Sequence, residues 1–418
     1  MEELKEYKVA EVIEEISMGP FGSNIKVDNF IDSGIPVLNG SNLQGFKLNE
    51  DSFNYVSQEK ADSLGKANAH KGDVVITHRG TLGQIVYIPE DSKYKQYVIS
   101  QSQFRLKLNQ DLIRPDFFVY FFHTRLGQHR ILMNASQVGV PALARPTSTF
   151  KEVLVPVPSM DVQIKVMDIL HSLDDKIEAN RRINENLEQQ AQALFKSWFV
   201  DFEPFRDGEF VESELGMIPK GWRVGTLGEI GDIVGGSTPS KSKPEYYTDK
   251  GIAWLTPKDL SISNNKFTSK GEIDITEEGY KSCSTKLMPK GSVLFSSRAP
   301  IGYITIAKND ICTNQGFKSV VPKLAGTAFI YFFLKLSTKD IENKATGSTF
   351  KEASGALMKS LQLIIAPERI LHDFESLMKP LFTQQEVLED ESRRLSELRD
   401  TLLPKLMSGE FKVGDVLL

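Results

Sequence analysis

The chain has 418 residues, which is enough for two or more domains that each bury a hydrophobic core. Its 40% hydrophobic and 25% charged content is ordinary for a soluble globular protein. No apolar run approaches the ~20 residues of a membrane span, so we expect a cytoplasmic protein with no membrane partner. The two cysteines, Cys283 and Cys312, are too few for a disulfide framework and are not spaced for zinc, so we interpret them as packing residues.

The net charge of −5 argues at first against a polyanionic partner, but the charge is unevenly distributed. Residues 65–157 hold 12 Lys and Arg against 6 Asp and Glu, and residues 207–366 hold 20 against 17. Residues 1–64 are acidic, with 5 against 12. This asymmetry permits a surface that faces nucleic acid on two segments of the chain.

Residues 1–157 are predicted to form a first mixed α/β domain. Short apolar runs punctuated by glycine and proline, such as 34–38 and 74–76, are typical of strands. The aromatic segment 118–122 is predicted to be a buried helix, and the apolar strand 153–157 closes the domain at a proline.

Residues 158–206 are predicted to form a long helix. Apolar residues recur there at alternating spacings of three and four, which is the 3.5-residue seam of a coiled coil. The seam residues that we assign to a subunit interface are Leu170, Leu173, Ile177, Leu187, Leu194 and Trp198, together with Leu388, Leu395, Leu402 and Leu406 near the C-terminus.

Residues 207–366 repeat the first domain. The segment 71–83 (KGDVVITHRGTLG) is similar to the segment 290–302 (KGSVLFSSRAPIG), which lies 219 residues later and aligns with it without a gap. Each copy runs from a turn into an apolar strand, a small polar loop with one arginine, and a second strand. A period of half the chain is too long for a solenoid, whose units have about 20–50 residues. It indicates a duplicated domain, and hence a ligand with two parts.

Residues 367–418 are predicted to form a second long helix, with seam residues Leu388, Leu395, Leu402 and Leu406. Two such helices with a domain between them most simply pair with each other in antiparallel orientation. We therefore predict an α+β fold, in which two pseudo-repeated mixed α/β domains are separated by two long helices that form an antiparallel coiled coil. The helix pair is either a spacer alone or a spacer that is also a docking surface.

No catalytic constellation is found in the sequence. It contains no GxxxxGK[ST] phosphate loop, no GxGxxG motif after a strand, and no Asn/Asp-Pro-Pro-Tyr/Phe motif of amino-methyltransferases. The six histidines form no HExxH pair and have no metal spacing with cysteine. We therefore expect no catalytic residue and no metal, and we predict a protein that is not an enzyme.

Five motifs, in the family's order, resemble the specificity subunit of type I restriction–modification systems. Segments 194–205, 215–222 and 402–410 are similar to the end of that family's central conserved region, the entry to its second target-recognition domain and its C-terminal conserved region. Segments 19–23 and 235–239 resemble the glycine-rich motif near the start of each recognition domain.

The resemblance implies a non-catalytic DNA reader. Residues 1–157 and 207–366 would be target-recognition domains 1 and 2, each binding one half of a bipartite target. Residues 158–206 and 367–418 would be the central and C-terminal conserved helices, which set the gap between the halves. The implied partners are double-stranded DNA, two methyltransferase subunits docked on the helices and, as an optional addition, translocating nuclease subunits. The chain itself would bind no cofactor, because S-adenosylmethionine is used by the methyltransferase.

Within this interpretation, the arginine of each hairpin loop is the first candidate for DNA contact. A forked arginine bonds guanine O6 and N7 together, which is worth roughly 1–3 kcal/mol, and small neighbouring residues let the loop approach DNA. Alternatively, Arg79 and Arg298 each bridge a nearby carboxylate. The polar runs 100–103 and 313–315 supply amides that read adenine or orient the arginine, unless they are solvated strand edges.

Further candidates follow matching strands or lie in the glycine-rich entries, which could equally be tight turns. The complete set of DNA-binding candidates is Ser23, Ser41, Asn42, Thr77, His78, Arg79, Gln101, Gln103 and Arg105 in the first domain, and Ser237, Lys258, Ser297, Arg298, Asn314, Gln315 and Lys318 in the second. An alternative function stays open: a coiled-coil adaptor with two peptide- or protein-binding domains, which the acidic helices favour. Steep weakening of binding by salt would distinguish DNA binding from the adaptor.

Overall fold

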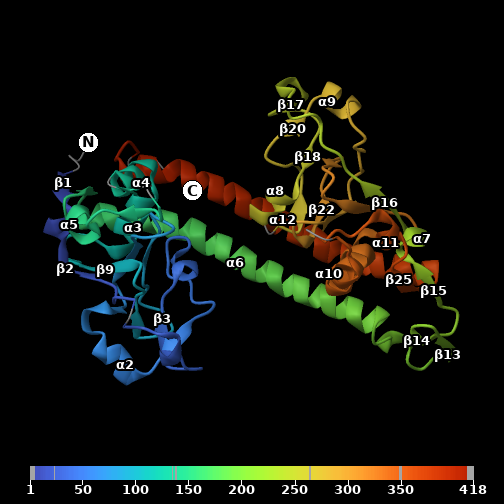
Figure 1. Cartoon of the computed structure of the whole chain (residues 1–418), viewed down its shortest axis with the longest axis horizontal. Coiled ribbons are helices and arrows are strands. Elements are labelled where there is room, and N and C mark those ends of the chain that lie inside the picture. Colours follow the sequence, from blue (N-terminus) through green and yellow to red (C-terminus); the bar gives the residue numbers. More distant parts are fainter. Residues whose placement is uncertain are drawn as a thin grey trace. The chain divides into compact units, whose positions relative to one another are not determined.

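The computed structural model describes residues 5–22, 24–133, 135–136, 139–262, 265–347 and 351–411 (Figure 1). Its contacts divide the chain into two compact units. The first unit comprises Met1–Ile177 with Arg394–Leu418, and the second unit comprises Glu178–Arg393. Two 40-residue helices, α6 (Met160–Phe199) and α12 (Glu368–Met407), contribute to both units, so the unit boundaries fall inside these helices. Within the described part of the chain, no helix combines the length and apolar character needed to cross a membrane.

Two four-stranded sheets form the globular part of the first unit. The order is β2-β9-β6-β7 in one sheet, where all neighbours are antiparallel, and β4-β3-β8-β5 in the other. The strands of these sheets are β2 (Ile13–Met18), β9 (Gln103–Leu108), β6 (Val74–Thr77), β7 (Ile85–Tyr87), β4 (Asn54–Val56), β3 (Ile35–Val37), β8 (Gln96–Val98) and β5 (Asn68–His70). Two short pairs are β1 (Lys5–Lys8) with β12 (Leu154–Val157) and β10 (Ala135–Ser136) with β11 (Ala142–Leu143). The helices before α6 are α1 (Val9–Val12), α2 (Gln58–Ser63), α3 (Pro115–His123), α4 (Arg125–Leu132) and α5 (Pro146–Lys151).

The aromatic run that was predicted to be a buried helix is α3. Its first residue, Pro115, suits a helix start because the N–H that proline lacks would have no intrahelical partner there. Every residue from Asp116 to Phe122 is buried, and the rings of Phe118 and Phe122 pack on Phe150 with centroid distances of 6.4 and 5.3 Å. The prediction that this segment belongs to the core is confirmed.

A five-stranded sheet of order β16-β24-β21-β22-β19 is the centre of the second unit. Its strands are β16 (Gly231–Gly235), β24 (Lys318–Pro322), β21 (Val293–Ser297), β22 (Ile301–Ala307) and β19 (Phe267–Thr268). Shorter pairs are β13 (Phe210–Ser213) with β14 (Gly216–Pro219), β15 (Arg223–Thr226) with β25 (Gln362–Ile365), β17 (Tyr247–Thr248) with β20 (Asp274–Ile275), and β18 (Trp254–Leu255) with β23 (Cys312–Thr313). The helices between α6 and α12 are α7 (Leu227–Ile230), α8 (Pro257–Ile262), α9 (Glu277–Lys281), α10 (Thr327–Lys344) and α11 (Gly355–Lys359). Cys312 packs in a buried cluster with Trp254 and Ile275, and Cys283 is half-buried.

The two units repeat one topology. The antiparallel order β2-β9-β6-β7 of the first unit matches β16-β24-β21-β22 of the second, strand for strand in chain order. The second unit adds β19 in parallel to β22. In each unit an aromatic helix, α3 or α10, follows the last of the four matching strands. The predicted α+β fold with two pseudo-repeated domains is confirmed.

Helices α6 and α12 pair with each other inside each unit. In the second unit, Asn180 bonds Glu391 at 2.8 Å, Asn184 bonds the Gln385 carbonyl at 3.5 Å, and the ring of Trp198 lies 5.7 Å from that of Phe374. Residue numbers therefore rise along α6 as they fall along α12, which is the predicted antiparallel arrangement. In the first unit, Asp174 of α6 pairs with Arg399 of α12 at 2.7 Å.

The seam residues that were assigned to a subunit interface lie inside each unit instead. Leu170, Leu173, Leu402 and Leu406 are buried in the core of the first unit, Leu388 is 5% exposed, and Leu194 and Trp198 pack against the core of the second unit. Ile177, Leu187 and Leu395 are half-buried. The assignment was wrong for the buried residues, because helix pairing already buries the seam within the chain. Only the other faces of the two helices remain accessible to a partner subunit. The large apolar side chains that the two helices do expose are Ile164, Ile183, Leu377, Val387 and Leu398.

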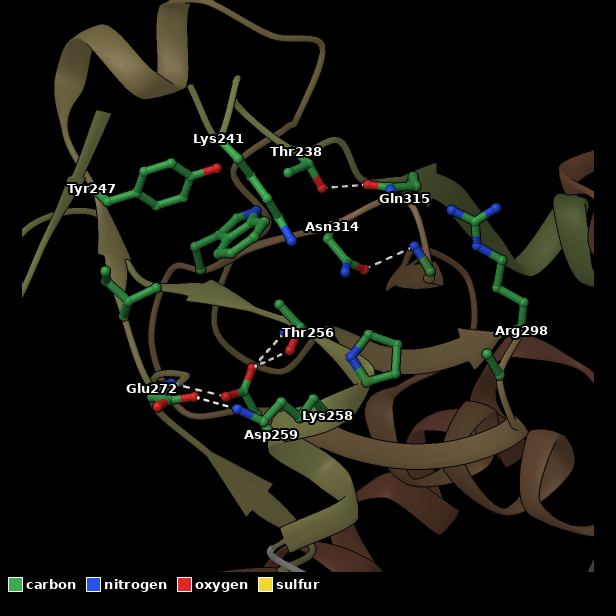
Figure 2. Close-up of a pocket in the computed structure, with 15 residues that line it drawn as sticks. Thr238, Lys241, Tyr247, Thr256, Lys258, Asp259, Glu272, Arg298, Asn314 and Gln315 are labelled. Carbon is green, nitrogen blue, oxygen red and sulfur yellow. Dashed lines mark hydrogen bonds and ion pairs between the residues drawn. The ribbon is translucent and has the colours of Figure 1, made fainter. Parts of the chain in front are cut away.

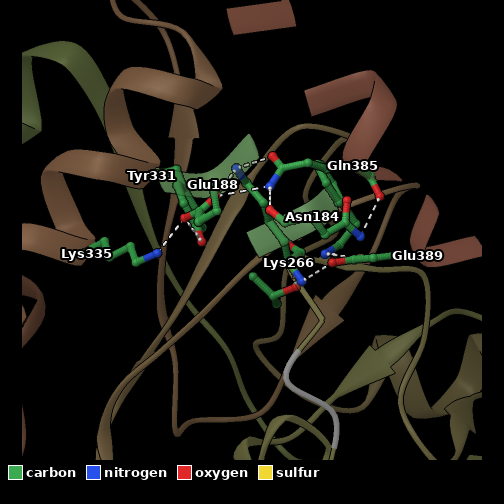
Figure 3. Close-up of polar contacts among 9 residues, drawn as sticks. Asn184, Glu188, Lys266, Tyr331, Lys335, Gln385 and Glu389 are labelled. Carbon is green, nitrogen blue, oxygen red and sulfur yellow. Dashed lines mark hydrogen bonds and ion pairs between the residues drawn. The ribbon is translucent and has the colours of Figure 1, made fainter. Parts of the chain in front are cut away.

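A buried polar cluster joins the helix pair to the sheet of the second unit (Figure 3). We name it the Lys266 cluster, and its members are Glu188, Lys266, Tyr331, Lys335, Gln385 and Glu389. Lys266 is 7% exposed, and its Nζ donates to Glu188 Oε2 at 2.7 Å and to Gln385 Oε1 at 2.8 Å. The Phe382 ring lies 3.4 Å from Nζ, which adds a cation–π contact. Glu188 also accepts from Lys335 at 2.5 Å and from Tyr331 at 3.1 Å.

The environment of the Lys266 cluster shifts the pKa values of four of its members, and burial raises that of Tyr331 well above its ordinary value. Burial lowers the pKa of Lys266 to about 8, although Glu188 acts in the opposite direction. Burial alone would raise the pKa of Glu188, but its ion pairs with Lys266 and Lys335 outweigh burial and lower that pKa to about 2. Burial raises the pKa of Glu389 to about 7. The backbone N–H groups of Lys266 and Phe267, which donate to its carboxylate at 2.8 and 3.1 Å, lower this pKa but do not outweigh burial.

We expect the substitution Glu389→Gln to change how stability depends on pH. A folded pKa of about 7, above the ordinary 4.5, means that folding favours the protonated carboxyl group. This contribution is complete below pH 4.5 and is lost as the pH rises through 7, so the wild-type free energy of unfolding should fall relative to the variant over this range. Denaturant titrations of both proteins at a series of pH values measure the difference, and parallel pH profiles would contradict the expectation.

Candidate nucleic-acid interface

The second unit has a cleft of about 620 Å³ beside its duplicated hairpin loop (Figure 2). The loop between β21 and β22 forms one wall, and the segments that follow β16, β18 and β23 form the others. Four residues selected from the sequence line this cleft: Lys258, Arg298, Asn314 and Gln315. The fold therefore brings together candidates that lie up to 57 positions apart in the chain.

Arg298 stands at the tip of the β21–β22 hairpin and is about one-third exposed. Its Nη1 pairs with Glu352 Oε2 at 3.3 Å, and Lys318 donates to the other oxygen of the same carboxylate at 3.1 Å. The alternative of an arginine that bridges a carboxylate thus holds for Arg298. Side-chain exposures of 36% for Arg298 and 36% for Glu352 leave the pair open to solvent, so the guanidinium keeps accessible donors. Lys318 has a side-chain exposure of only 19% and serves as a second counter-ion for Glu352, which argues against direct DNA contact.

Asn314 and Gln315 follow β23 and lie at one rim of the cleft (Figure 2). The Oδ1 of Asn314 accepts from the Gly316 backbone N–H at 2.8 Å, and the Oε1 of Gln315 accepts from the Thr238 hydroxyl. Asn314 is half-buried and Gln315 is exposed. Both amides are thus held by their oxygens.

Two carboxylates occupy the other end of the cleft. Asp259 Oδ2 accepts from the Thr256 N–H and hydroxyl, both at 2.7 Å, and its Oδ1 accepts from the Glu272 N–H at 2.9 Å. Lys258 pairs with Glu272 at 2.9 Å, and both side chains are about 70% exposed. Lys258 therefore remains an accessible candidate, since an exposed ion pair of this kind is weak.

The glycine-rich segment of each unit packs against a neighbouring loop. A Cβ on Gly236 would lie 2.1 Å from the Thr313 carbonyl oxygen, and one on Gly19 would lie 1.9 Å from the Ser100 carbonyl oxygen. Only glycine permits these approaches. Ser237, whose N–H donates to the Thr313 carbonyl at 3.0 Å, is half-buried in this packing. The tight-turn interpretation of the glycine motif is therefore favoured, and the candidate Ser23 lies outside the described residues.

In the first unit, Arg79 is exposed at the tip of the β6–β7 hairpin. Among the described residues, no carboxylate lies within ion-pair distance of Arg79, in contrast to Arg298. The backbone of His78 and Gly80 bonds Leu143 and Pro141 at 2.9 Å each, which anchors the loop. His78 Nε2 lies 3.1 Å from the Gln101 carbonyl oxygen, and burial lowers the pKa of His78. Gln101 itself is exposed.

Three candidates near the hairpins lie in the protein interior. Thr77 is 3% exposed and bonds Gln84 at 3.2 Å, Gln103 is fully buried and accepts from the Ser100 N–H at 2.8 Å, and Ser297 is fully buried and bonds the Gly316 carbonyl at 3.1 Å. Their selection as DNA contacts is corrected, because these side chains cannot reach DNA without unpacking the core.

Arg105 and Asn42 are also structural. Arg105 is 6% exposed and pairs with Asp73 at 3.3 Å and Glu15 at 3.2 Å. Asn42 is 1% exposed; its amide donates to two carbonyl groups at 3.0 Å and its oxygen accepts from the Asn39 N–H at 2.9 Å. Arg105 and Asn42 are therefore no longer candidates for DNA contact, since both side chains are buried and bond other residues of the first unit. Ser41 is exposed, but its hydroxyl donates to Asn39 at 2.6 Å.

Several residues at these sites carried no signal that we used in the sequence. Lys241 and Thr238 line the cleft of the second unit, where Lys241 belongs to the Ser-Lys-Ser-Lys run 240–243. Phe21 of the first unit is 84% exposed in the glycine-rich segment, beside a pocket that Gln101 also lines. A run of alternating serine and lysine and an aromatic residue between two glycines are the features that could have indicated them.

Among the described residues, no group of three or more His, Cys, Asp or Glu side chains is placed to hold a metal ion. The cleft of the second unit offers guanidinium, ammonium, amide, hydroxyl and carboxylate groups to a ligand, which suit recognition by hydrogen bonds.

Comparisons with known proteins agree with this arrangement. The family model described as type I restriction modification DNA specificity domain matches residues 1–189 and 219–386. The type I restriction enzyme HindI specificity subunit of Haemophilus influenzae is 27% identical over 406 residues, covering 81% of this chain and 86% of that protein. The MjaIX specificity subunit of Methanocaldococcus jannaschii is 40% identical over 191 residues, covering 43% of this chain and 44% of that protein. The crystal structure of a type I restriction-modification system S subunit from M. genitalium shares the fold, with a TM-score of 0.60 and 17% identity over 97% of both chains. Because the family model covers both repeated units, the chain belongs to the type I restriction modification DNA specificity family.

Proposed function

We propose that this chain is the non-catalytic, DNA-reading subunit of a cytoplasmic type I restriction–modification complex. Each unit reads one half of a bipartite target in double-stranded DNA. Family membership supports this proposal over the adaptor alternative. The observation that carries it is the equivalent placement of Arg79 and Arg298, each at the tip of a hairpin between the same two strands of a repeated sheet, and each accessible to solvent.

The helix pair supplies the second part of the proposed function. Two methyltransferase subunits dock on it, bring S-adenosylmethionine to the target, and are joined in some assemblies by nuclease subunits. Since the seam is buried, docking uses other faces of α6 and α12, where Ile183, Val387 and Leu398 are each more than 40% exposed.

Alanine substitution of each hairpin arginine tests the proposal. Arg79→Ala should relax or abolish recognition of one half-site and leave the other half-site unchanged, and Arg298→Ala should do the reverse. The expected loss of discrimination is about 1–3 kcal/mol at the contacted base. The measurement is selection of duplexes from a pool with randomised half-sites, using the full chain assembled with its methyltransferase subunits.

Arg206→Ala is the matched control, since Arg206 is an exposed arginine outside both hairpins. Binding of the wild-type complex should also weaken steeply with ionic strength, because phosphate contacts release counterions. Salt-independent binding, or equal weakening of all sequences by both hairpin variants, would contradict base reading by these arginines.

A further inference from the structure

The amides at the rim of the second unit's cleft direct their oxygens toward other groups of the protein. The Gly316 N–H fixes the orientation of the Asn314 amide, since a backbone N–H bonds only the side-chain oxygen. The Thr238 hydroxyl donates to the Gln315 oxygen. Within the described part of the chain, neither Asn314 Nδ2 nor Gln315 Nε2 has a hydrogen-bond partner. Both amides therefore present their NH₂ groups.

The neighbouring accessible side chains at this rim are donors as well. Lys241 is exposed, and Arg298 keeps guanidinium N–H groups beyond the one that pairs with Glu352. Figure 2 shows Arg298 extending toward the Gln315 end of the cleft, away from Asp259 and Glu272. We name Lys241, Arg298, Asn314 and Gln315 the donor edge. The carboxylates of Asp259 and Glu272 lie at the opposite end of the cleft and bond Thr256 and Lys258, and the carboxylate of Glu352 pairs with Arg298 itself.

A donor edge restricts which bases it can read. A free glutamine or asparagine reads adenine in the major groove with two bonds: it donates to N7 and accepts from the N6 amino group. The oxygens of Asn314 and Gln315 already accept one bond within the protein, so their NH₂ groups are better placed for the donation to N7 than their oxygens are for the bond from N6. Guanine presents two adjacent acceptors in the major groove, O6 and N7, and no donor, so it satisfies two neighbouring donors at once.

We propose that the donor edge reads guanine in the major groove of the second half-site, and that Thr238 enforces this choice by holding the Gln315 oxygen. This inference rests on the proposed function, because it names the base class that the second unit recognises. It replaces the expectation that these amides read adenine.

Three variants test the inference in the selection described above, again with the full chain and its methyltransferase subunits. Gln315→Ala should relax the preference for guanine at one position and weaken binding to the wild-type target about 5- to 150-fold, the range of one good base contact. Gln315→Glu should replace guanine with cytosine, whose N4 amino group donates to a carboxylate. Thr238→Val should add adenine as an accepted base, because the Gln315 amide is then free to turn its oxygen toward a base.

Each variant should leave the first half-site and the gap unchanged. Gln101→Glu, an exposed glutamine of the corresponding loop in the first unit, is the matched control and should leave the second half-site unchanged. A second half-site that lacks a constant guanine would overturn the inference. Uniform weakening of all sequences by Gln315→Glu would also overturn it and would identify a phosphate contact. In both cases the proposed function stands. Failure of the wild-type complex to enrich any bipartite duplex would instead overturn the proposed function.

Discussion

Replacement of Glu188 by alanine is expected to lower the free energy of unfolding of the second unit by about 3–5 kcal/mol. The carboxylate of Glu188 is the counter-ion of Lys266, which is 7% exposed. Without it, the ammonium group stays buried among four aromatic rings with only the Gln385 oxygen as a hydrogen-bond acceptor. Removing one partner of a buried ion pair costs far more than the pair contributes, because the remaining charge has lost its hydration and its partner. Denaturant unfolding of the full chain, monitored by hydrogen exchange of the backbone amides of the second unit, measures the loss of unfolding free energy.

Two controls separate the buried pair from ordinary surface charge. Glu209→Ala breaks the exposed pair with Lys220, whose side chains are 66% and 74% exposed, and should cost about 0–1 kcal/mol. The double variant Glu188→Leu with Lys266→Met removes both charges and should recover most of the stability that Glu188→Ala loses. If Glu188→Ala cost no more than Glu209→Ala, the Lys266 cluster would not hold the helix pair to the sheet.

Insertion of one heptad into each long helix is expected to lengthen the unread gap of the target by about three base pairs. Seven residues add about 10 Å of helix, and base pairs stack at about 3.4 Å. The insertions belong beside Asn180 in α6 and Glu391 in α12, which bond each other, so that the added turns face one another. Because seven residues are two turns of the 3.5-residue seam, the buried faces stay in register. Methylation of the original target should be lost, and the new target should keep both half-sites with the longer gap.

The matched control places the same seven residues in the exposed turn at Gly208, outside both helices. It changes the chain length equally but should leave the gap as in the wild type. Sequencing that detects the modified base in the genome of a host expressing each variant measures half-sites and gap together. An unchanged gap after the helix insertions would end the idea that the helix pair sets the spacing.

The elements that could be predicted from the sequence are those whose pattern is local. The alternating spacing of Leu170, Leu173 and Ile177 reports a coiled-coil seam directly, because helical periodicity places these residues on one face. The hairpins of 71–83 and 290–302 repeat turn, strand and loop within thirteen residues, and both were found where they were predicted. The pairing of the two helices was predicted correctly, but the seam residues were also assigned to a subunit interface, which was wrong for the buried ones. A seam pattern states that a face is buried but not whether it is buried within the chain or by a partner subunit.

The candidate sites were predicted less well, for a physical reason. Polar side chains near a loop are equally able to bond water, a ligand or the protein, and their identity does not distinguish these partners. Gln101 and Gln103 lie two positions apart, yet the first is exposed and the second is fully buried on the Ser100 N–H. Arg105 was predicted from the sequence to contact DNA. In the fold it instead forms ion pairs with Asp73 and Glu15, which are 32 and 90 positions away in the chain.

The sequence by itself determined that the chain holds two copies of one domain and two long helices that pair, because duplication and helical periodicity are written in neighbouring residues. Only the tertiary structure decided which polar groups face a ligand and whether they donate or accept. Thr238 is 77 positions from Gln315, and their hydrogen bond directs the oxygen of that amide toward the protein. Contacts of this kind join residues whose closeness is set by the packing of whole sheets, so no local pattern reports them.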